Sequence, residues 1–318
     1  MAEVFAIPLR TRFRGITVRE GMLLQGDAGW GEFSPFLEYD AATSAPWLAA
    51  AREAADLGWP APVRSSVPVN VTVPACAPGL AAEIVRASAG CRTAKVKVAE
   101  RGQEVGEDVA RLEAVRDALG PSGLVRIDVN GGWTVDEAVA RIPLLDRAAG
   151  GLEYVEQPCA SVEELALVRR RVSVPIAADE SIRRAADPYR VRDLAAADIA
   201  VLKVQPLGGV RACLRIAEEI GLPVVVSSAV ESSVGIAAGV ALAAALPELP
   251  HACGLATVQL LTGDVVAEPL LPVDGSIPIR PAVVDPGALQ RMRAGEERRT
   301  HWERRLAEVA AVLEDQRS

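Results

Sequence analysis

Lysine is rare in this chain, and its few positions are the first indication of chemistry. The sequence has 318 residues and 34 lysines and arginines, of which only Lys95, Lys97 and Lys203 are lysines. Arginine keeps its proton in proteins, whereas a lysine amine in a desolvated site can release and accept one. Proton transfer and Schiff-base formation by a cationic side chain therefore require lysine. The three lysines are candidate catalytic residues.

Three carboxylates lie between these lysines at a regular spacing. The steps from Lys97 through Asp128, Glu156 and Asp179 to Lys203 are 31, 28, 23 and 24 residues. Each step is about one strand–helix unit long, and each residue falls in or at the end of a short β-rich run. Carboxylates from neighbouring strands are typical ligands of a hard divalent cation, and Mg²⁺ keeps positions open for substrate oxygens. The pattern predicts one Mg²⁺ site, with Mn²⁺ as a possible substitute, flanked by two lysines.

The elements that must position these residues form a repeat that begins at about residue 67. Short β-rich runs alternate with amphipathic helical patterns, which indicates parallel pairing and predicts an α/β fold, a (β/α)8 TIM-type barrel. An open doubly wound sheet is disfavoured, because the turn Pro74–Pro78 lacks a glycine-rich phosphate loop. The eight runs are Val67–Val73, Ala94–Val98, Val125–Val129, Leu152–Glu156, Pro175–Asp179, Ile199–Val204, Pro223–Ser227 and His251–Leu255.

The alternation of side chains along a strand predicts which residues face the barrel interior. Lys95 and Lys97 are two positions apart and share one face, while Val96 and Val98 pack against the helices. Asp128 faces inward in the same way, with Arg126 below it. Barrels of this kind carry out their chemistry at the carboxyl ends of the strands.

The two ends of the chain lack the repeat and are predicted to form an α+β capping domain. We expect residues 1–62 to supply its N-terminal part, 63–280 the catalytic barrel, and 281–318 a C-terminal segment that packs with the cap. Strands are predicted at Thr17–Leu24 and Trp30–Phe33 and a helix at Ala41–Leu57. The segments Arg12–Arg19 and Phe33–Tyr39 are expected to cover the barrel mouth.

Composition narrows the class of function. A net charge of −8 and a pI of about 5.1 disfavour nucleic acid and anionic membranes as partners. The longest apolar stretch, Val234–Pro247, is too short to span a bilayer and is predicted to be a buried helix. Five scattered cysteines and the absence of a secretory signal in Met1–Arg14 predict a cytoplasmic protein. Nothing in the sequence decides the oligomeric state.

The motifs around the charged residues resemble the enolase superfamily, and within it the muconate-lactonizing subgroup. These motifs are KVK (Lys95–Lys97), DVNGGW (Asp128–Trp133), EQP (Glu156–Pro158), DES (Asp179–Ser181) and LKVQPLGG (Leu202–Gly209). The resemblance covers essentially the whole chain, cap included. The segments SSAVESSVG (Ser227–Gly235) and CGLAT (Cys253–Thr257) are similar to the o-succinylbenzoate synthase family of menaquinone biosynthesis.

This resemblance implies a reaction and a role for the ring of charged residues. It implies Mg²⁺ bound by Asp128, Glu156 and Asp179, with Lys97 as the acid/base and Lys203 on the opposite face of the substrate. The implied reaction is the syn dehydration of 2-succinyl-6-hydroxy-2,4-cyclohexadiene-1-carboxylate to o-succinylbenzoate, which is carbon–oxygen lyase (hydro-lyase) chemistry. The implied partner is thus a small-molecule carboxylate.

The resemblance also implies how the substrate is held. Arg126, Ser227 and Gly254 match positions that bind the substrate's carboxylates, and Lys95 matches a position that supports the reacting carboxylate or Lys97. Each of these roles is an expectation about contacts that the fold must provide.

Other reactions remain open on the same site. Two lysines on opposite faces also suit an N-succinylamino acid racemase or another racemase or epimerase. Dipeptide epimerases carry an acidic motif near the eighth strand, whereas this chain reads CGLATVQLL (Cys253–Leu261) and has no carboxylate there before Asp264. Mandelate-racemase chemistry needs a histidine on the seventh strand, which ends here in Ser227 and Ser228. A metal-free Schiff-base barrel is disfavoured by three surplus inward carboxylates.

Overall fold

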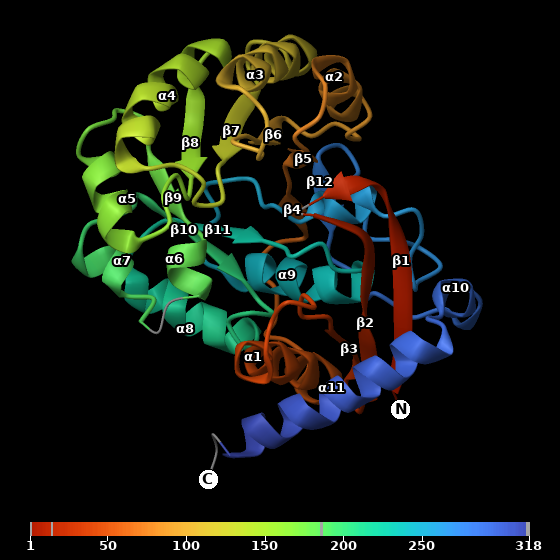
Figure 1. Ribbon diagram of the computed structural model, residues 1–318. Coiled ribbons are helices and arrows are strands. Elements are labelled where there is room, and N and C mark those ends of the chain that lie inside the picture. Colours follow the sequence, from red (N-terminus) through yellow and green to blue (C-terminus); the bar gives the residue numbers. More distant parts are fainter. Residues whose placement is uncertain (1, 14, 185–186, 316–318) are drawn as a thin grey trace.

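The computed structural model describes residues 2–13, 15–184 and 187–315, which form a barrel and a cap (Figure 1). Seven parallel strands are hydrogen-bonded in chain order. They are β5 (Val71–Val73), β6 (Thr93–Lys97), β7 (Leu124–Asp128), β8 (Leu152–Glu156), β9 (Ile176–Ala178), β10 (Ile199–Lys203) and β11 (Val224–Ser227). The helices around them are α2 (Pro78–Arg86), α3 (Val105–Leu119), α4 (Val135–Ala148), α5 (Val162–Arg169), α6 (Glu180–Arg183), α7 (Arg190–Asp193), α8 (Val210–Ile220) and α9 (Ser233–Ala245).

The barrel is closed by a segment much shorter than a regular strand. Cys253 forms a parallel bridge with Val69, just before β5, and Gly254 forms one with Ser227 at the end of β11. The Asn70 amide donates to the Cys253 carbonyl (2.9 Å), and the Gly254 amide donates to the Val226 carbonyl (2.8 Å). The predicted eighth run therefore joins the two edges of the sheet, and the predicted TIM-type barrel is confirmed.

One predicted strand is wrong. The run Val67–Val73 is divided into β4 (Ser66–Pro68) and β5, and β4 leaves the barrel to pair antiparallel with β12 (Ser276–Pro278). Pro68 has no amide hydrogen, so it suits the end of an edge strand rather than the interior of a sheet. The alternating valines predicted the extended backbone correctly but did not show that it changes partners at this proline.

Local signals in the helical segments agree with the structure. Thr134 and Glu137 form a capping box at the start of α4, as do Ser161 and Glu164 at the start of α5. Gly221 ends α8 in the left-handed conformation, which glycine adopts without a steric penalty. The apolar helix predicted near residue 234 is α9, most of which is buried between the barrel and the cap.

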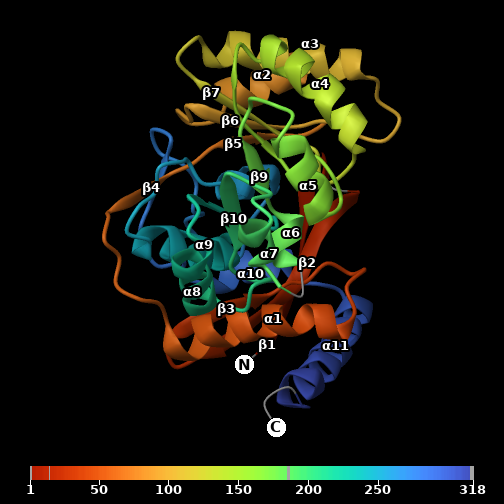
Figure 2. The same ribbon diagram turned by 90° about the vertical axis from the view of Figure 1, so that its left-hand side faces the viewer.

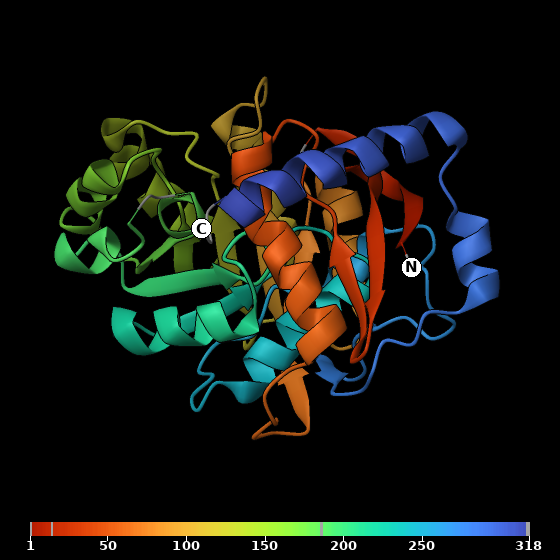
Figure 3. The same cartoon turned by 90° about the horizontal axis from the view of Figure 1, so that it is seen from below.

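The cap combines both ends of the chain. Its antiparallel sheet contains β1 (Ala2–Phe13), β2 (Ile16–Gly26) and β3 (Gly29–Phe33). The remaining elements are α1 (Ala41–Arg52), the π-helical turn η1 (Glu53–Leu57), α10 (Pro286–Met292) and α11 (Glu296–Asp315). The helices α1 and α11 pack against each other below the sheet (Figures 2 and 3). The cap is thus formed by the two segments that lack the barrel repeat, and its numerical limits remain predictions.

Aromatic packing ties the two ends of the cap together. Trp302 of α11 is fully buried and meets Phe33 of β3 edge-to-face, with ring centroids 5.9 Å apart. The sheet also lies very close to α1: a Cβ on Gly31 would stand 1.9 Å from the Ala51 carbonyl oxygen. Only glycine allows β3 and α1 to approach this closely.

Strand β1 is an element that the sequence interpretation missed. Phe5, Ile7 and Leu9 occupy every second position and are buried, which is the pattern of a half-buried strand. Pro8 and three alternating arginines further along obscured it. Arg14, inside the segment expected to cover the barrel mouth, lies outside the described residues. None of the helices in the described part of the chain is both long and apolar enough to cross a membrane.

Candidate active site

The charged residues predicted from spacing meet at the carboxyl ends of the barrel strands. Lys97 is paired in register with Asp128, and Asp128 with Glu156. Asp179 directly follows β9, and Lys203 is paired with Ser227 across β10 and β11. Parallel strands with this register bring their last residues to one level. Five consecutive strands therefore place Lys, Asp, Glu, Asp and Lys around one end of the barrel.

Two lysines of β6 pair with the first two carboxylates. The Lys95 amine lies 2.9 Å from Glu156 Oε1 and 3.1 Å from Asp128 Oδ2. The Lys97 amine donates to Asp128 Oδ2 (2.6 Å) and to Asn130 Oδ1 (2.5 Å). Lys97 is the more accessible of the two, with 17% of its side chain exposed against 8% for Lys95. It is therefore the amine better placed to reach a bound molecule.

The third lysine lies on the other side of the ring. Lys203 Nζ is 2.6 Å from Asp179 Oδ2, and Arg183 Nε donates to Asp179 Oδ1 (2.9 Å). Arg183 also pairs with Glu180 (2.5 Å), and Glu180 accepts a hydrogen bond from Asn130 Nδ2 (3.3 Å). Since β7, β8 and β9 separate β6 from β10, Lys97 and Lys203 face the space between them from opposite sides.

Burial and neighbouring charges change the acidity of the three carboxylates in different directions. Burial raises the pKa of Glu156 to about 7, and the neighbouring Asp128 adds to this effect. Burial also acts on Asp128, but Lys97 and Lys95 outweigh it and hold the pKa of Asp128 below its ordinary value. In Asp179, Arg183 and Lys203 outweigh burial in the same way and lower the pKa. Of the three carboxylates, Glu156 is thus the one whose charged form is least favoured by its surroundings.

Burial and neighbouring charges also shift the pKa values of two lysine amines, in opposite directions. Burial disfavours the charged form of Lys95, but Glu156 and Asp128 outweigh it and hold the pKa of this amine well above its ordinary value. Burial lowers the pKa of Lys203, and the nearby Arg183 lowers it further, against the opposing attraction of Asp179. Lys95 is thus held as a cation, whereas Lys203 is less firmly protonated.

The three carboxylates fit a divalent cation by their chemistry. Asp128, Glu156 and Asp179 are at most 1% exposed and offer only hard oxygen donors. Within the described residues, no group of three or more acidic, histidine or cysteine side chains is arranged as a finished metal centre. Instead, the carboxylates point to the lysines and Arg183. The fit to a cation therefore rests on the oxygen donors themselves, which are buried and come from three neighbouring strands.

A cavity above this ring joins the barrel and the cap. Phe13 and Phe36 of the cap line it together with Lys97, Lys203 and Ser227. The cap thus lies over the carboxyl ends of the strands, as the sequence predicted for the segments around residues 12–19 and 33–39. Its remaining lining residues are Thr72, Lys95, Asp128, Asn130, Arg183, Ser228, Ala229, Val230, Gly254 and Thr257.

Ser227 and Gly254 are held together at one wall of the cavity. A Cβ on Gly254 would lie 2.6 Å from Ser227 Oγ, so the wall requires glycine at this position. Ser228 Oγ donates to the Gly254 carbonyl (2.8 Å) and lies 2.8 Å from Thr257 Oγ1. The same cavity is thus lined by small polar groups on this wall and by the aromatic rings of Phe13 and Phe36 from the cap.

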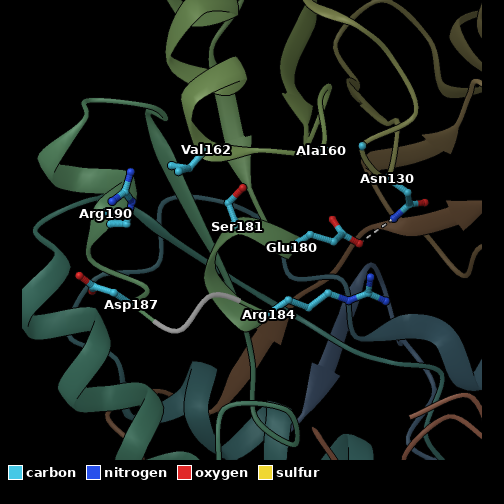
Figure 4. A pocket seen from close by; sticks show the side chains of 9 residues that line it. Asn130, Ala160, Val162, Glu180, Ser181, Arg184, Asp187 and Arg190 are labelled. Carbon is cyan, nitrogen blue, oxygen red and sulfur yellow. Dashed lines mark hydrogen bonds between the residues drawn. The ribbon is translucent and has the colours of Figure 1, made fainter. Parts of the chain in front are cut away.

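A second cavity of about 410 Å³ adjoins the site on its outer side (Figure 4). Asn130 lines both cavities and Glu180 lines the second one, and the hydrogen bond between them is drawn as a dashed line in the figure. Arg184 extends toward them from the loop after α6, and its guanidinium also donates to the Tyr39 hydroxyl (3.0 Å). Polar groups thus continue from the lysine ring to the protein surface.

Two family models match the chain in consecutive segments. Residues 4–55 match the model described as Enolase N-terminal domain-like, and residues 79–288 match the one described as Enolase C-terminal domain-like. The o-succinylbenzoate synthase of Thermobifida fusca is 70% identical over 312 residues, which cover 98% of this chain and 96% of the relative. That of Mycolicibacterium smegmatis is 56% identical over 311 residues, or 98% and 95% of the two chains. The chain belongs to the o-succinylbenzoate synthase family of the enolase superfamily.

Solved structures of other enzymes share the fold at low sequence identity. Muconate lactonizing enzyme from Pseudomonas putida aligns with a TM-score of 0.76 at 22% identity, covering 92% of this chain and 98% of that one. The L-Ala-D/L-Glu epimerase from Bacillus subtilis aligns with a TM-score of 0.75 at 23% identity, covering 89% and 96%. Enzymes with different names thus share this barrel-and-cap architecture.

One predicted substrate ligand does not reach the cavity. Within the described residues, the cavity walls do not include Arg126, which is fully buried beneath them. Its guanidinium pairs with Glu153 (2.5 Å) and donates to Tyr154 Oη (3.1 Å) and the Ala252 carbonyl (2.7 Å). Arg126 is paired in register with Lys95, which lines the cavity, but its guanidinium is directed to these other partners. Its role as a ligand of a substrate carboxylate stays a prediction.

Several residues of the site were not foreseen. Arg183 follows Asp179 by four positions, and this helical spacing could have identified it as a partner of that carboxylate. Phe13 and Phe36 lie in the two cap segments that were expected to cover the barrel mouth, but no local signal singled out these two rings. Their place in an enolase-superfamily site is visible only in the tertiary structure.

Proposed function

We propose that this enzyme dehydrates 2-succinyl-6-hydroxy-2,4-cyclohexadiene-1-carboxylate to o-succinylbenzoate, as the name of its relatives indicates. The geometry alone suits any reaction that begins by removing a proton next to a carboxylate, because Lys97 and Lys203 face one cavity from opposite sides. The observation that carries the proposal is the 70% identity, over nearly the whole length of both chains, to an o-succinylbenzoate synthase.

In this proposal Lys97 performs both proton transfers. Its neutral amine takes the proton from the carbon that bears the carboxylate, and the electron pair of that C–H bond is delocalised onto the carboxylate oxygens. This pair forms the new ring double bond when the C–O bond breaks. The protonated amine then delivers the proton to the hydroxyl group on the same face, the C–O bond breaks, and water leaves. The ring becomes aromatic, so the atoms and charges balance without an oxidant. Lys203, whose charged form is favoured by Asp179 at 2.6 Å although burial and Arg183 oppose it, acts as the cation on the other face and stabilises the intermediate negative charge.

We propose that Asp128, Glu156 and Asp179 hold a divalent cation, Mg²⁺ or in its place Mn²⁺. When bound, the cation stabilises the negative charge that develops on the carboxylate during proton removal. Lys95, which lies against Glu156 and Asp128, then keeps these two ligands oriented. The oxygen-only donor set favours such hard cations over softer metals.

The charges around the site also suit a dicarboxylate. Each of the three carboxylates at the strand ends pairs with at least one cationic side chain, and Glu180 pairs with Arg183. A divalent cation therefore adds two positive charges that a substrate with two carboxylates would neutralise. We propose that the carboxylate on the substrate's cyclohexadiene ring lies toward Asp128, Glu156 and Asp179. The carboxylate of its succinyl group then lies at the wall formed by Ser227 and Gly254.

Separate substitutions of the two catalytic lysines test this division of roles. Lys97→Arg keeps the charge but removes the titratable amine, and should abolish both dehydration and α-proton exchange with deuterated solvent. Lys203→Arg keeps the cation and should retain more dehydration than Lys97→Arg. Product formation is followed by the absorbance of the aromatic ring, after circular dichroism and Mg²⁺ binding show that each variant is intact.

Racemisation of N-succinylamino acids is the second candidate, because it needs one amine on each face of the substrate. It should disappear in both variants. Equal and complete loss of dehydration in the two folded, Mg²⁺-binding variants would contradict the single-base reaction and favour a two-base enzyme. The five cysteines are free thiols, which supports a cytoplasmic location for either reaction.

A further inference from the structure

One wall of the active-site cavity is built on an unfavourable backbone conformation. Val230, in the loop between β11 and α9, has a φ angle of 65° and lines the cavity together with Ala229. This left-handed conformation is uncommon outside glycine and is a real outlier for a β-branched residue. Such a conformation persists only where the surroundings hold it, and it is often found at functional sites.

The contacts that hold this loop come from the cap. Arg19, on β2, donates from Nε to the Val230 carbonyl (3.2 Å) and from its terminal nitrogen to Ser34 Oγ (2.8 Å). Ser34 Oγ in turn donates to Glu32 Oε1 (2.7 Å). Arg19, Ser34 and Glu32 thus form a connected polar chain that begins at the cavity wall and runs back into the cap sheet.

Glu32, on β3, ends this chain at the first turn of α9. Its carboxylate accepts hydrogen bonds from the amides of Ser232 and Gly235, both 3.1 Å long, and from the Ser232 hydroxyl. A carboxylate at this end of a helix satisfies unpaired amides and interacts favourably with the helix dipole. A residue of the cap therefore caps a helix of the barrel.

The barrel is shaped to admit this carboxylate. A Cβ on Gly235 would lie 2.5 Å from Glu231 Cβ and 3.0 Å from Glu32 Cδ, so glycine is required where the cap enters. Glu231 holds the loop from within, because its carboxylate accepts the Ala229 amide (2.7 Å). Arg19, Glu32 and Glu231 are at most 3% exposed. Buried charges of this kind are expensive unless they are paired.

We infer that Arg19 and Glu32 are positioning residues that hold the loop Ala229–Ser232 in the strained conformation that shapes the cavity wall. Docking of the cap and the form of the substrate site are therefore coupled through one polar chain. This inference rests on the proposed function. Neither residue lines the catalytic cavity in the described part of the chain, so substitution should weaken substrate binding more than the chemical step.

A double-mutant cycle between Arg19 and Val230 tests the coupling. Arg19→Met removes the hydrogen bonds but keeps most of the side chain, and should raise KM for the cyclohexadiene carboxylate by about tenfold, with kcat within about threefold of wild type. Val230→Gly should not lower KM in the wild-type enzyme, because it only removes a side chain from the wall. In the Arg19→Met background it should lower KM, because glycine keeps the left-handed conformation without support.

Arg293→Met is the control for loss of an arginine elsewhere in the cap, since Arg293 pairs with Glu3 at 3.1 Å on the surface and should leave KM unchanged. Arg19→Lys keeps the charge and serves if Arg19→Met does not fold; if neither folds, the same cycle is run with the isosteric Glu32→Gln. A KM within twofold of wild type in the folded variant, or the same effect of Val230→Gly in both backgrounds, would overturn the inference. An inactive wild-type enzyme would instead overturn the proposed function.

Discussion

The ion pair beneath the active site provides a sharp test of how this barrel is stabilised. Arg126 is fully buried, and Glu153, with 12% of its side chain exposed, is its charged partner. The Arg126 guanidinium also donates to Asn70 (3.3 Å), Tyr154 and Ala252, while its Nη2 has no hydrogen-bond partner among the described residues. Glu153→Gln removes the countercharge and leaves the buried cation with neutral acceptors only.

Breaking a buried pair from one side costs about 3–5 kcal/mol, because the remaining charge is uncompensated. We expect the lower end, about 3 kcal/mol, since three neutral acceptors remain for Arg126. For a chain of this size that loss corresponds to a decrease in Tm of about 6 °C. Arg171→Gln is the control: its pair with Asp136 is 3.5 Å long and largely exposed, and its loss should cost less than about 0.5 kcal/mol.

The double variant Arg126→Met/Glu153→Leu separates charge from packing. Replacing both partners with apolar side chains should recover most of the stability lost in Glu153→Gln, as measured by thermal and urea unfolding. Because Arg126 is not on the cavity wall, KM should remain within about threefold of wild type. A loss below about 1 kcal/mol in Glu153→Gln would refute the stability argument. A large rise in KM in the folded double variant would return Arg126 to the role of a carboxylate ligand.

Three further outcomes are expected from other parts of the molecule. Excess EDTA should abolish activity, and Asp128→Asn should remove most of the Mg²⁺ affinity measured by calorimetry; full activity in EDTA would exclude the metal site. Burial raises the pKa of Glu32 to about 7 from 4.5, so folding takes up a proton between these values. The free energy of unfolding relative to Glu32→Gln should therefore fall by up to about 3 kcal/mol as pH rises from 4.5 to 7 and stay level above it; a level difference throughout would contradict the raised pKa. Gly31→Ala should destabilise the cap by more than about 2 kcal/mol in urea unfolding, because the new Cβ would meet the Ala51 carbonyl oxygen. A stability equal to wild type would show that β3 and α1 can separate freely.

Features set by local periodicity could be predicted from the sequence, and features set by distant contacts could not. The spacing from Lys97 to Lys203 reflects the length of one strand–helix unit, so it correctly indicated residues that share one end of the barrel. Alternation along β7 turned Arg126 inward and placed it below Asp128, but could not show that Glu153, Tyr154 and the Ala252 carbonyl take up its guanidinium. The contributions of Phe13 and Phe36 to the cavity depend on how the cap docks, and this is not encoded in either segment alone.

The shared construction of the cap has a consequence for the order of events during synthesis. Phe33 leaves the ribosome early, but the aromatic ring that packs against it belongs to Trp302, which also completes the apolar cluster around Trp47. The barrel strands β5 to β11 and the closing residue Gly254 are all synthesised before Trp302. The barrel can therefore close while the cap is still incomplete. Segments that fold in order of synthesis leave apolar surface exposed until their partners arrive. In this protein the apolar face of β3 and α1 must therefore remain uncovered through the synthesis of more than two hundred residues, and a nascent chain halted before α11 is the form most exposed to chaperones and proteases.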